Sequence, residues 1–171
     1  MSIELGQQIS LWAVRLALLF WFLFAFSRIV DRSRLQDVKL RGLWTMATVL
    51  YAIHVLTAFA YFHEWSHEAA VQHTADRTHE FIGIHWGGGI WFNHFFTVLC
   101  TIEMVTWWVR PQAINGRAIR MSWMVYGYCL FIIFNAAIVF VAGPTRWINT
   151  VALLMLVALY FRNHPRNEPR N

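Results

Sequence analysis

The sequence predicts an all-α integral membrane protein, with five transmembrane helices bundled in a single domain over residues 1–162. Hydrophobic residues make up 58% of the 171-residue chain and charged residues only 13%, against roughly 45–50% and about 25% in soluble domains. The ten tryptophans suit a chain that crosses membrane interfaces, where indole rings gather. The net charge of +5 comes from cations beside the apolar stretches, so it indicates membrane topology rather than nucleic-acid binding.

Five apolar stretches approach the length of about 20 residues that a helix needs to cross a bilayer. They are residues 9–26, 43–62, 90–109, 122–141 and 147–161. The last is the shortest, and we expect it to cross only with snorkelling side chains or local thinning of the bilayer. We expect no cleaved signal peptide, because the N-terminus lacks a basic region and leads directly into the first span.

The basic residues predict the orientation of the bundle. If the connections alternate between the two sides, all but three of the fourteen basic residues fall on one side. The positive-inside rule then places the N-terminus outside and the C-terminus, with a flexible tail at 163–171, in the cytoplasm. The connection at residues 63–89 (the outer loop) lies outside the cytoplasm. We expect a plasma membrane of the bacterial inner-membrane type as the location.

The outer loop contains five of the eight histidines. No glycine or proline occurs between Leu43 and Ile82, so we expect the second helix to continue beyond the membrane. On such a helix His63 and His67 form an i, i+4 pair, and Glu64 and Glu68 form a second pair about 100° around. Zinc and iron sites use imidazole and carboxylate ligands together. These four residues are therefore a predicted metal site; the alternative is a solvated helix that binds nothing.

Three further histidines follow His67 at steps of six residues, which places them on different faces of a helix. They are His73, His79 and His85. The three glycines at 87–89 allow close approach of the chain. We expect them either to bend the outer loop so that His85 joins the metal site near His63 or His94, or to act only as a flexible hinge.

Two histidines lie inside the predicted spans, where ionisable residues generally mark functional sites. His54 is about 12 Å and His94 about 6 Å below the outer surface, at 1.5 Å per residue. On neighbouring antiparallel helices they are candidate axial ligands of a b-type haem, although the mismatch in depth opposes this. The alternative is one interhelical hydrogen bond each.

One acidic residue, Glu103, falls inside a predicted span. We expect it to pair with a cation such as Arg28 or Arg41, or to belong to a proton path.

The leading functional hypothesis is a multi-span membrane protein with a histidine-based metal site (zinc or iron) or haem site on its outer side. It would serve as the membrane subunit of a redox system, in contact with other membrane or extracytoplasmic subunits. Two alternatives remain open. One is an accessory subunit without a cofactor, whose outer loop is a docking surface; the other is a metal-dependent membrane enzyme with a metal-bound water as nucleophile. The expected partner in every case is the lipid bilayer, and nucleic acid is not expected.

Overall fold

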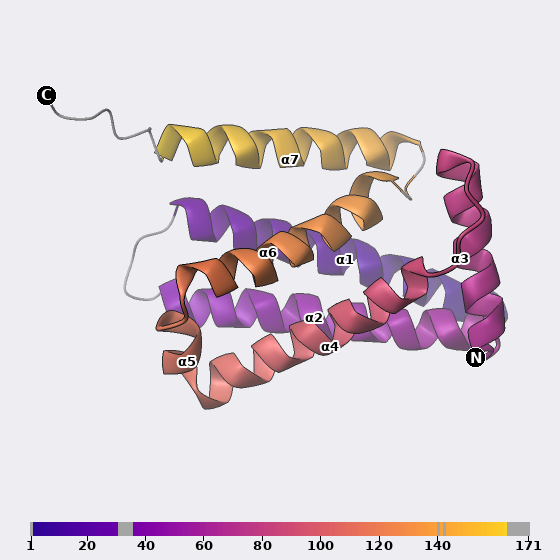
Figure 1. Cartoon of the computed structure of the whole chain (residues 1–171), viewed down its shortest axis with the longest axis horizontal. Helices are drawn as coiled ribbons and strands as arrows, with labels where there is room; N and C mark the ends of the chain where they lie inside the picture. Colours follow the sequence, from indigo (N-terminus) through magenta and orange to yellow (C-terminus); the bar gives the residue numbers. More distant parts are fainter. Residues whose placement is uncertain (1, 31–35, 140, 142, 164–171) are drawn as a thin grey trace, which may run out of the picture.

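The computed structural model describes residues 2–30, 36–139, 141 and 143–163, and every regular element in them is a helix. The long helices run alongside one another, α3 crosses one end of the bundle, and α5 lies at the other end (Figure 1). The elements are α1 (Ile3–Val30), α2 (Gln36–Tyr61), α3 (His67–Ile82), α4 (Gly89–Val109), α5 (Pro111–Asn115), α6 (Ile119–Phe134), the π-helical η1 (Asn135–Val139) and α7 (Pro144–Asn163). The predicted all-α class is confirmed. The predicted tail lies outside the described residues, apart from Asn163.

Within the described residues, four helices are long and apolar enough to cross a membrane: α1, α2 from Asp37, α6 together with η1, and α7. At 20 residues, α7 extends beyond the predicted last span at both ends and reaches about 30 Å. The added residues include Arg146, Arg162 and Asn163, so snorkelling or local thinning of the bilayer stays a prediction. The helix α4 is 21 residues long, but it carries Asn93, His94 and Glu103 and is not one of the four. A membrane protein is therefore indicated, while the count of five spans stays a prediction.

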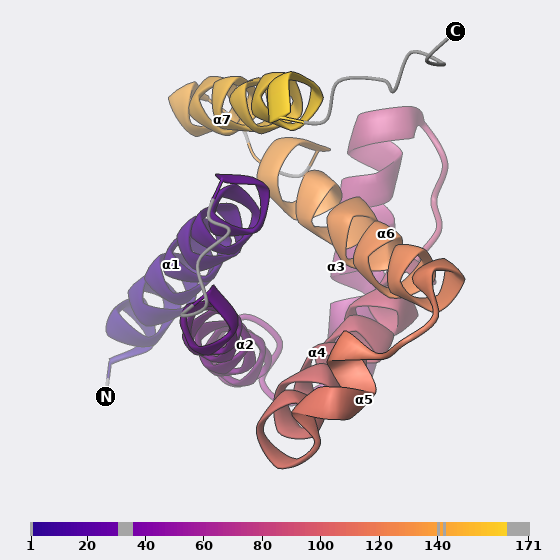
Figure 2. The ribbon, with the colours of Figure 1, turned by 90° about the vertical axis from the view of Figure 1, so that its left-hand side faces the viewer.

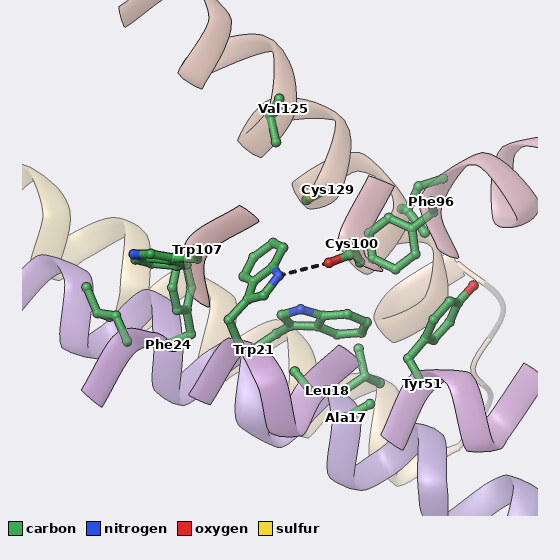
Figure 3. Packing of buried hydrophobic residues seen from close by; sticks show 14 of the residues in the cluster. Ala17, Leu18, Trp21, Phe24, Tyr51, Phe96, Cys100, Trp107, Val125 and Cys129 are labelled. Atoms are coloured by element: carbon green, nitrogen blue, oxygen red, sulfur yellow. Dashed lines mark hydrogen bonds between the residues drawn. The ribbon is translucent and has the colours of Figure 1, made fainter. Parts of the chain in front are cut away.

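An aromatic core joins α1 to α2 and α4 (Figure 3). The Phe24 ring lies 5.1 Å from that of Trp44, and the Trp21 ring lies 5.2 Å from that of Phe96, centroid to centroid. The Trp44 Nε1 donates a hydrogen bond of 3.3 Å to the Cys100 carbonyl. Tilted ring pairs of this kind contribute about 0.5–1.5 kcal/mol each beyond the area they bury. Side chains from α1, α2 and α4 therefore hold these three helices together.

A buried ion pair closes the end of the bundle that bears α5. The Glu103 side chain on α4 accepts a 2.6 Å hydrogen bond from Arg117 Nη1, and the two side chains are only 8% and 11% exposed. The prediction that Glu103 pairs with a cation is confirmed, but the expected partners, Arg28 and Arg41, were wrong. Arg41 bonds Asp37 one turn away, whereas the chain that follows α5 brings Arg117 back into the interior.

We predict that Glu103→Gln lowers the free energy of unfolding by about 3 kcal/mol or more, because it leaves the Arg117 charge buried without a counter-charge. Reversible unfolding in mixed detergent and dodecyl sulfate micelles measures this change. The matched control is Glu80→Gln, whose ion pair with Arg77 is 62% and 42% exposed and is worth less than about 1 kcal/mol. Equal effects of the two substitutions would contradict a buried, structural ion pair.

Candidate functional site

The turn after α2 departs from the predicted continuous helix. The helix ends at Tyr61, and Glu64 and Trp65 adopt left-handed backbone conformations with φ of 49° and 61°. Such conformations cost roughly 1–3 kcal/mol in residues with side chains, and persist only where the surroundings enforce them. The prediction that His63 and His67 lie one turn apart on a single helix is therefore wrong. They lie on either side of a sharp turn, after which α3 crosses the end of the bundle (Figure 1).

The predicted outer loop contains a helix, which corrects its description as a loop. The Ser66 hydroxyl caps the N-terminus of α3 by accepting a hydrogen bond of 3.1 Å from the Ala69 N–H. Gly83 ends it with φ of 74° and donates its N–H to His79 O at 2.8 Å. Two small residues, Ala70 and Ala75, are the buried residues of α3, so this helix buries little apolar surface. Seen along the bundle, α3 lies behind α4 and α6 (Figure 2).

Glycines at the start of α4 let the chain pass close to α3. A Cβ at Gly87 would lie 2.5 Å from the carbonyl oxygen of Val71, and one at Gly89 would lie 3.0 Å from Cγ2 of Thr74. Distances this short require glycine at position 87 if the backbones are to keep their positions. The glycines thus allow the beginning of α4 to lie directly against α3.

Four histidines from three segments gather where α2, α3 and α4 meet. We call His63, His67, His73 and His94 the imidazole cluster. The ring centroids of His63 and His73 are 5.4 Å apart, and those of His67 and His94 are 5.6 Å apart. Phe59 connects the two pairs, at 5.7 Å from His63 and 5.8 Å from His94. The fold therefore brings together two of the predicted metal ligands, one of the predicted haem ligands, and His73.

The spacing of the imidazole cluster approaches that of metal ligands, but its ring orientations do not converge. Two imidazoles that share a tetrahedral ion at Zn–N bonds of about 2.0 Å have centroids about 5 Å apart. The His67 and His94 rings, however, are stacked with an interplanar angle of 26°. The described part of the chain contains no group of three or more His, Cys, Asp or Glu side chains arranged to hold a metal ion.

His54 faces α1. Its Nδ1 donates to the Ser10 carbonyl at 3.0 Å, and the Ser10 hydroxyl donates to the His54 carbonyl at 3.3 Å. This is the interhelical hydrogen bond expected for a buried histidine without a cofactor. His94 instead contacts the rings of His67, Phe59 and Trp91. The pairing of His54 with His94 through a haem stays a prediction.

The remaining predicted ligands lie away from the imidazole cluster or at its edge. His85 Nε2 lies 3.1 Å from Asp76 Oδ1, and the two side chains are 54% and 55% exposed. The His85 ring is 6.3 Å from that of His79, so the glycines do not bring it to His63 or His94. The side chains of Glu64 and Glu68 are exposed on the turn and on the first turn of α3.

His73 was missed in the sequence because its position depends on α3. Ser66 before the segment and Gly83 after it are a helix start and a helix stop signal, and they could have revealed α3. The pairing of His67 with His94 had no signal of this kind, because it depends on the direction that the chain takes after Trp65.

Comparison with models of known families, with curated proteins and with solved structures gave no match.

Within the imidazole cluster, His63 favours the neutral form. Burial and the neighbouring His73 ring hold the pKa of His63 below the ordinary value of 6.5, because both disfavour the charged imidazolium. Neutral imidazole is the form that binds metal ions. At neutral pH His63 is thus in the protonation state that a metal ligand requires.

We predict that acid destabilises this end of the molecule. Because the pKa of His63 is lower in the folded chain than in the unfolded one, the unfolded chain takes up the proton first as the pH falls below about 6.5. The melting temperature should therefore fall as the pH is lowered from about 7.5 to about 5, and His63→Gln should reduce this dependence. Scanning fluorimetry provides the measurement, and His79→Gln is the control. An identical pH profile for wild type and His63→Gln would contradict the prediction.

We also predict that Gly87→Ala loosens α3, since the added Cβ would collide with the Val71 carbonyl. Amide hydrogen exchange across α3 should accelerate at least about tenfold. The matched control is Gly42→Ala on α2, where a Cβ would meet nothing within 4 Å. Wild-type protection of α3 in Gly87→Ala would show that the close approach is not required.

Proposed function

We propose that this chain is a multi-span membrane protein that binds a divalent transition-metal ion, zinc or a metal of similar ligand preference, at the imidazole cluster. The observation that carries the proposal is the presence of two imidazole pairs from three segments on either side of Phe59, with centroids 5.4 Å and 5.6 Å apart within the pairs. Histidine nitrogen is a preferred ligand of zinc, copper, nickel and iron. The lowered pKa of His63 further supports metal binding near neutral pH.

In this proposal the binding site is not preformed, and the ion draws the imidazole rings together when it binds. His67 and His73 are exposed on α3, so both can rotate about their side-chain torsions without disturbing the aromatic core. His94 and His63 are half-buried and flank Phe59. Three of the four imidazoles would coordinate the ion and leave a position for water or a small ligand, as in catalytic and transport sites.

The predicted carboxylates, Glu64 and Glu68, have a supporting role in this proposal. Both are exposed beside His63 and His67, where their charge attracts a cation to the cluster. His85 is not a ligand in the proposal, because it lies beside Asp76.

We further propose that the imidazole cluster lies on the non-cytoplasmic side. The opposite end of the bundle carries most of the described cations, which supports a cytoplasmic location for that end under the positive-inside rule. These cations are Arg28, Lys39, Arg41, Arg110, Arg117, Arg120 and Arg162. Either a redox role with extracytoplasmic partners or metal-dependent hydrolysis would require a metal site on the non-cytoplasmic side. The identity of the bound metal distinguishes these two roles.

Metal analysis tests the proposed function. Protein purified with a histidine-free affinity tag would be stripped with chelator, dialysed against zinc, and analysed by mass spectrometry of its metals. We expect one zinc ion per chain, and an affinity at least about tenfold lower for His67→Ala and His94→Ala. His79→Ala is the matched control, because His79 is an exposed histidine on the same helix outside the cluster.

Three results would contradict the proposal. They are the absence of retained zinc, an equal loss in His79→Ala, and a haem Soret band that depends on His54 or His94 in a chain that retains no zinc.

A further inference from the structure

An apolar cavity of ≈ 260 Å³ opens between α1, α6 and α7, in the half of the bundle away from the imidazole cluster. Its walls include Phe24 and Ala25 of α1, Tyr126 and Leu130 of α6, and Tyr160 of α7. The volume exceeds the roughly 150 Å³ of a protein cavity that admits benzene. It is smaller than the about 300–1,000 Å³ of pockets for drug-sized ligands. The cavity therefore suits a slender apolar group rather than a large ring system.

The charged side chain of Arg28 lies at the rim of this cavity. Arg28 also lines it, one helical turn from Phe24 on α1, and its side chain is exposed. Within the described ranges Arg28 has no carboxylate partner. The amide of Asn163 donates to the Ile29 carbonyl at 3.3 Å, which fastens the end of α7 beside Arg28 and brings Arg162 to the same end. The apolar interior thus has a positively charged entrance.

We propose that the cavity binds one acyl chain of an anionic phospholipid, with the lipid phosphate held at Arg28. An acyl chain matches the apolar lining and the volume of the cavity, and the planar guanidinium of arginine binds phosphate well. A zwitterionic lipid offers the same phosphate together with a cationic headgroup, so its net attraction to Arg28 is weaker. The exposed faces of α7, none of whose residues is fully buried, give lipid a direct route to the opening. This site is independent of the proposed metal site, because the two lie at opposite ends of α1 and α2.

Lipid titration followed by native mass spectrometry tests the proposal. Delipidated protein in detergent would receive phosphatidylglycerol or phosphatidylcholine with identical acyl chains. We expect phosphatidylglycerol to bind about fivefold more tightly, as one cation near a membrane surface contributes. Arg28→Gln should abolish this preference. Arg15→Gln should keep it, since Arg15 is on the same helix but stacks 5.0 Å from the Trp12 ring, away from the cavity.

A second variant tests the cavity itself. Ala25 lines this cavity and the smaller apolar one beside it, so Ala25→Leu should fill the space and weaken both lipids several-fold. Equal binding of the two lipids to wild type, an unchanged preference in Arg28→Gln, or undiminished binding in Ala25→Leu would each overturn the proposal. The proposal would also be overturned if a quinone or a free fatty acid, rather than phospholipid, co-purified with the protein and was displaced by Ala25→Leu.

Discussion

The left-handed turn at Glu64 and Trp65 is the constraint on which the end of the molecule that bears α3 depends. A continuing α2 would carry His67 away from the bundle. The two positive φ values, 49° and 61°, instead turn the chain so that α3 crosses the end of the bundle and His67 stacks on His94. The conformational cost of this turn must be offset by what it brings together. The contacts that offset it are the buried alanines of α3, the close approach at Gly87, and the rings around Phe59.

The imidazole cluster combines a fixed part and an adjustable part. His94 lies in the second turn of α4, whose later residues Phe96 and Cys100 are fully buried in the aromatic core. His67 and His73, in contrast, belong to a short helix that buries only Ala70 and Ala75. Elements with few buried contacts open at lower free energy than the core does. An ion that draws the rings together would thus move α3 against a nearly stationary α4, so that metal binding and the position of α3 are coupled.

The helical class and the uneven distribution of cations could be predicted from the sequence, because both depend on composition along the chain. It did not reveal where α2 ends, since the absence of glycine and proline says nothing about residues such as Glu64 and Trp65 that tertiary contacts hold in left-handed conformations. The pairing of Glu103 with a cation followed from the cost of a buried charge. Its partner, Arg117, depended on how the chain returns after α5. The contacts of the histidines could not be predicted either, because they depend on the direction in which α3 runs.

X-ray absorption spectroscopy of the zinc-loaded protein counts the imidazoles around the ion and so tests whether the cluster is a metal site. We expect at least three nitrogen ligands at about 2.0 Å, with the outer-shell scattering typical of imidazole rings. His67 and His94 would both contribute, although they are 27 residues apart in the chain. A zinc ion surrounded mainly by oxygen, with one imidazole or none, would contradict the claim that the turn after α2 assembles a metal site.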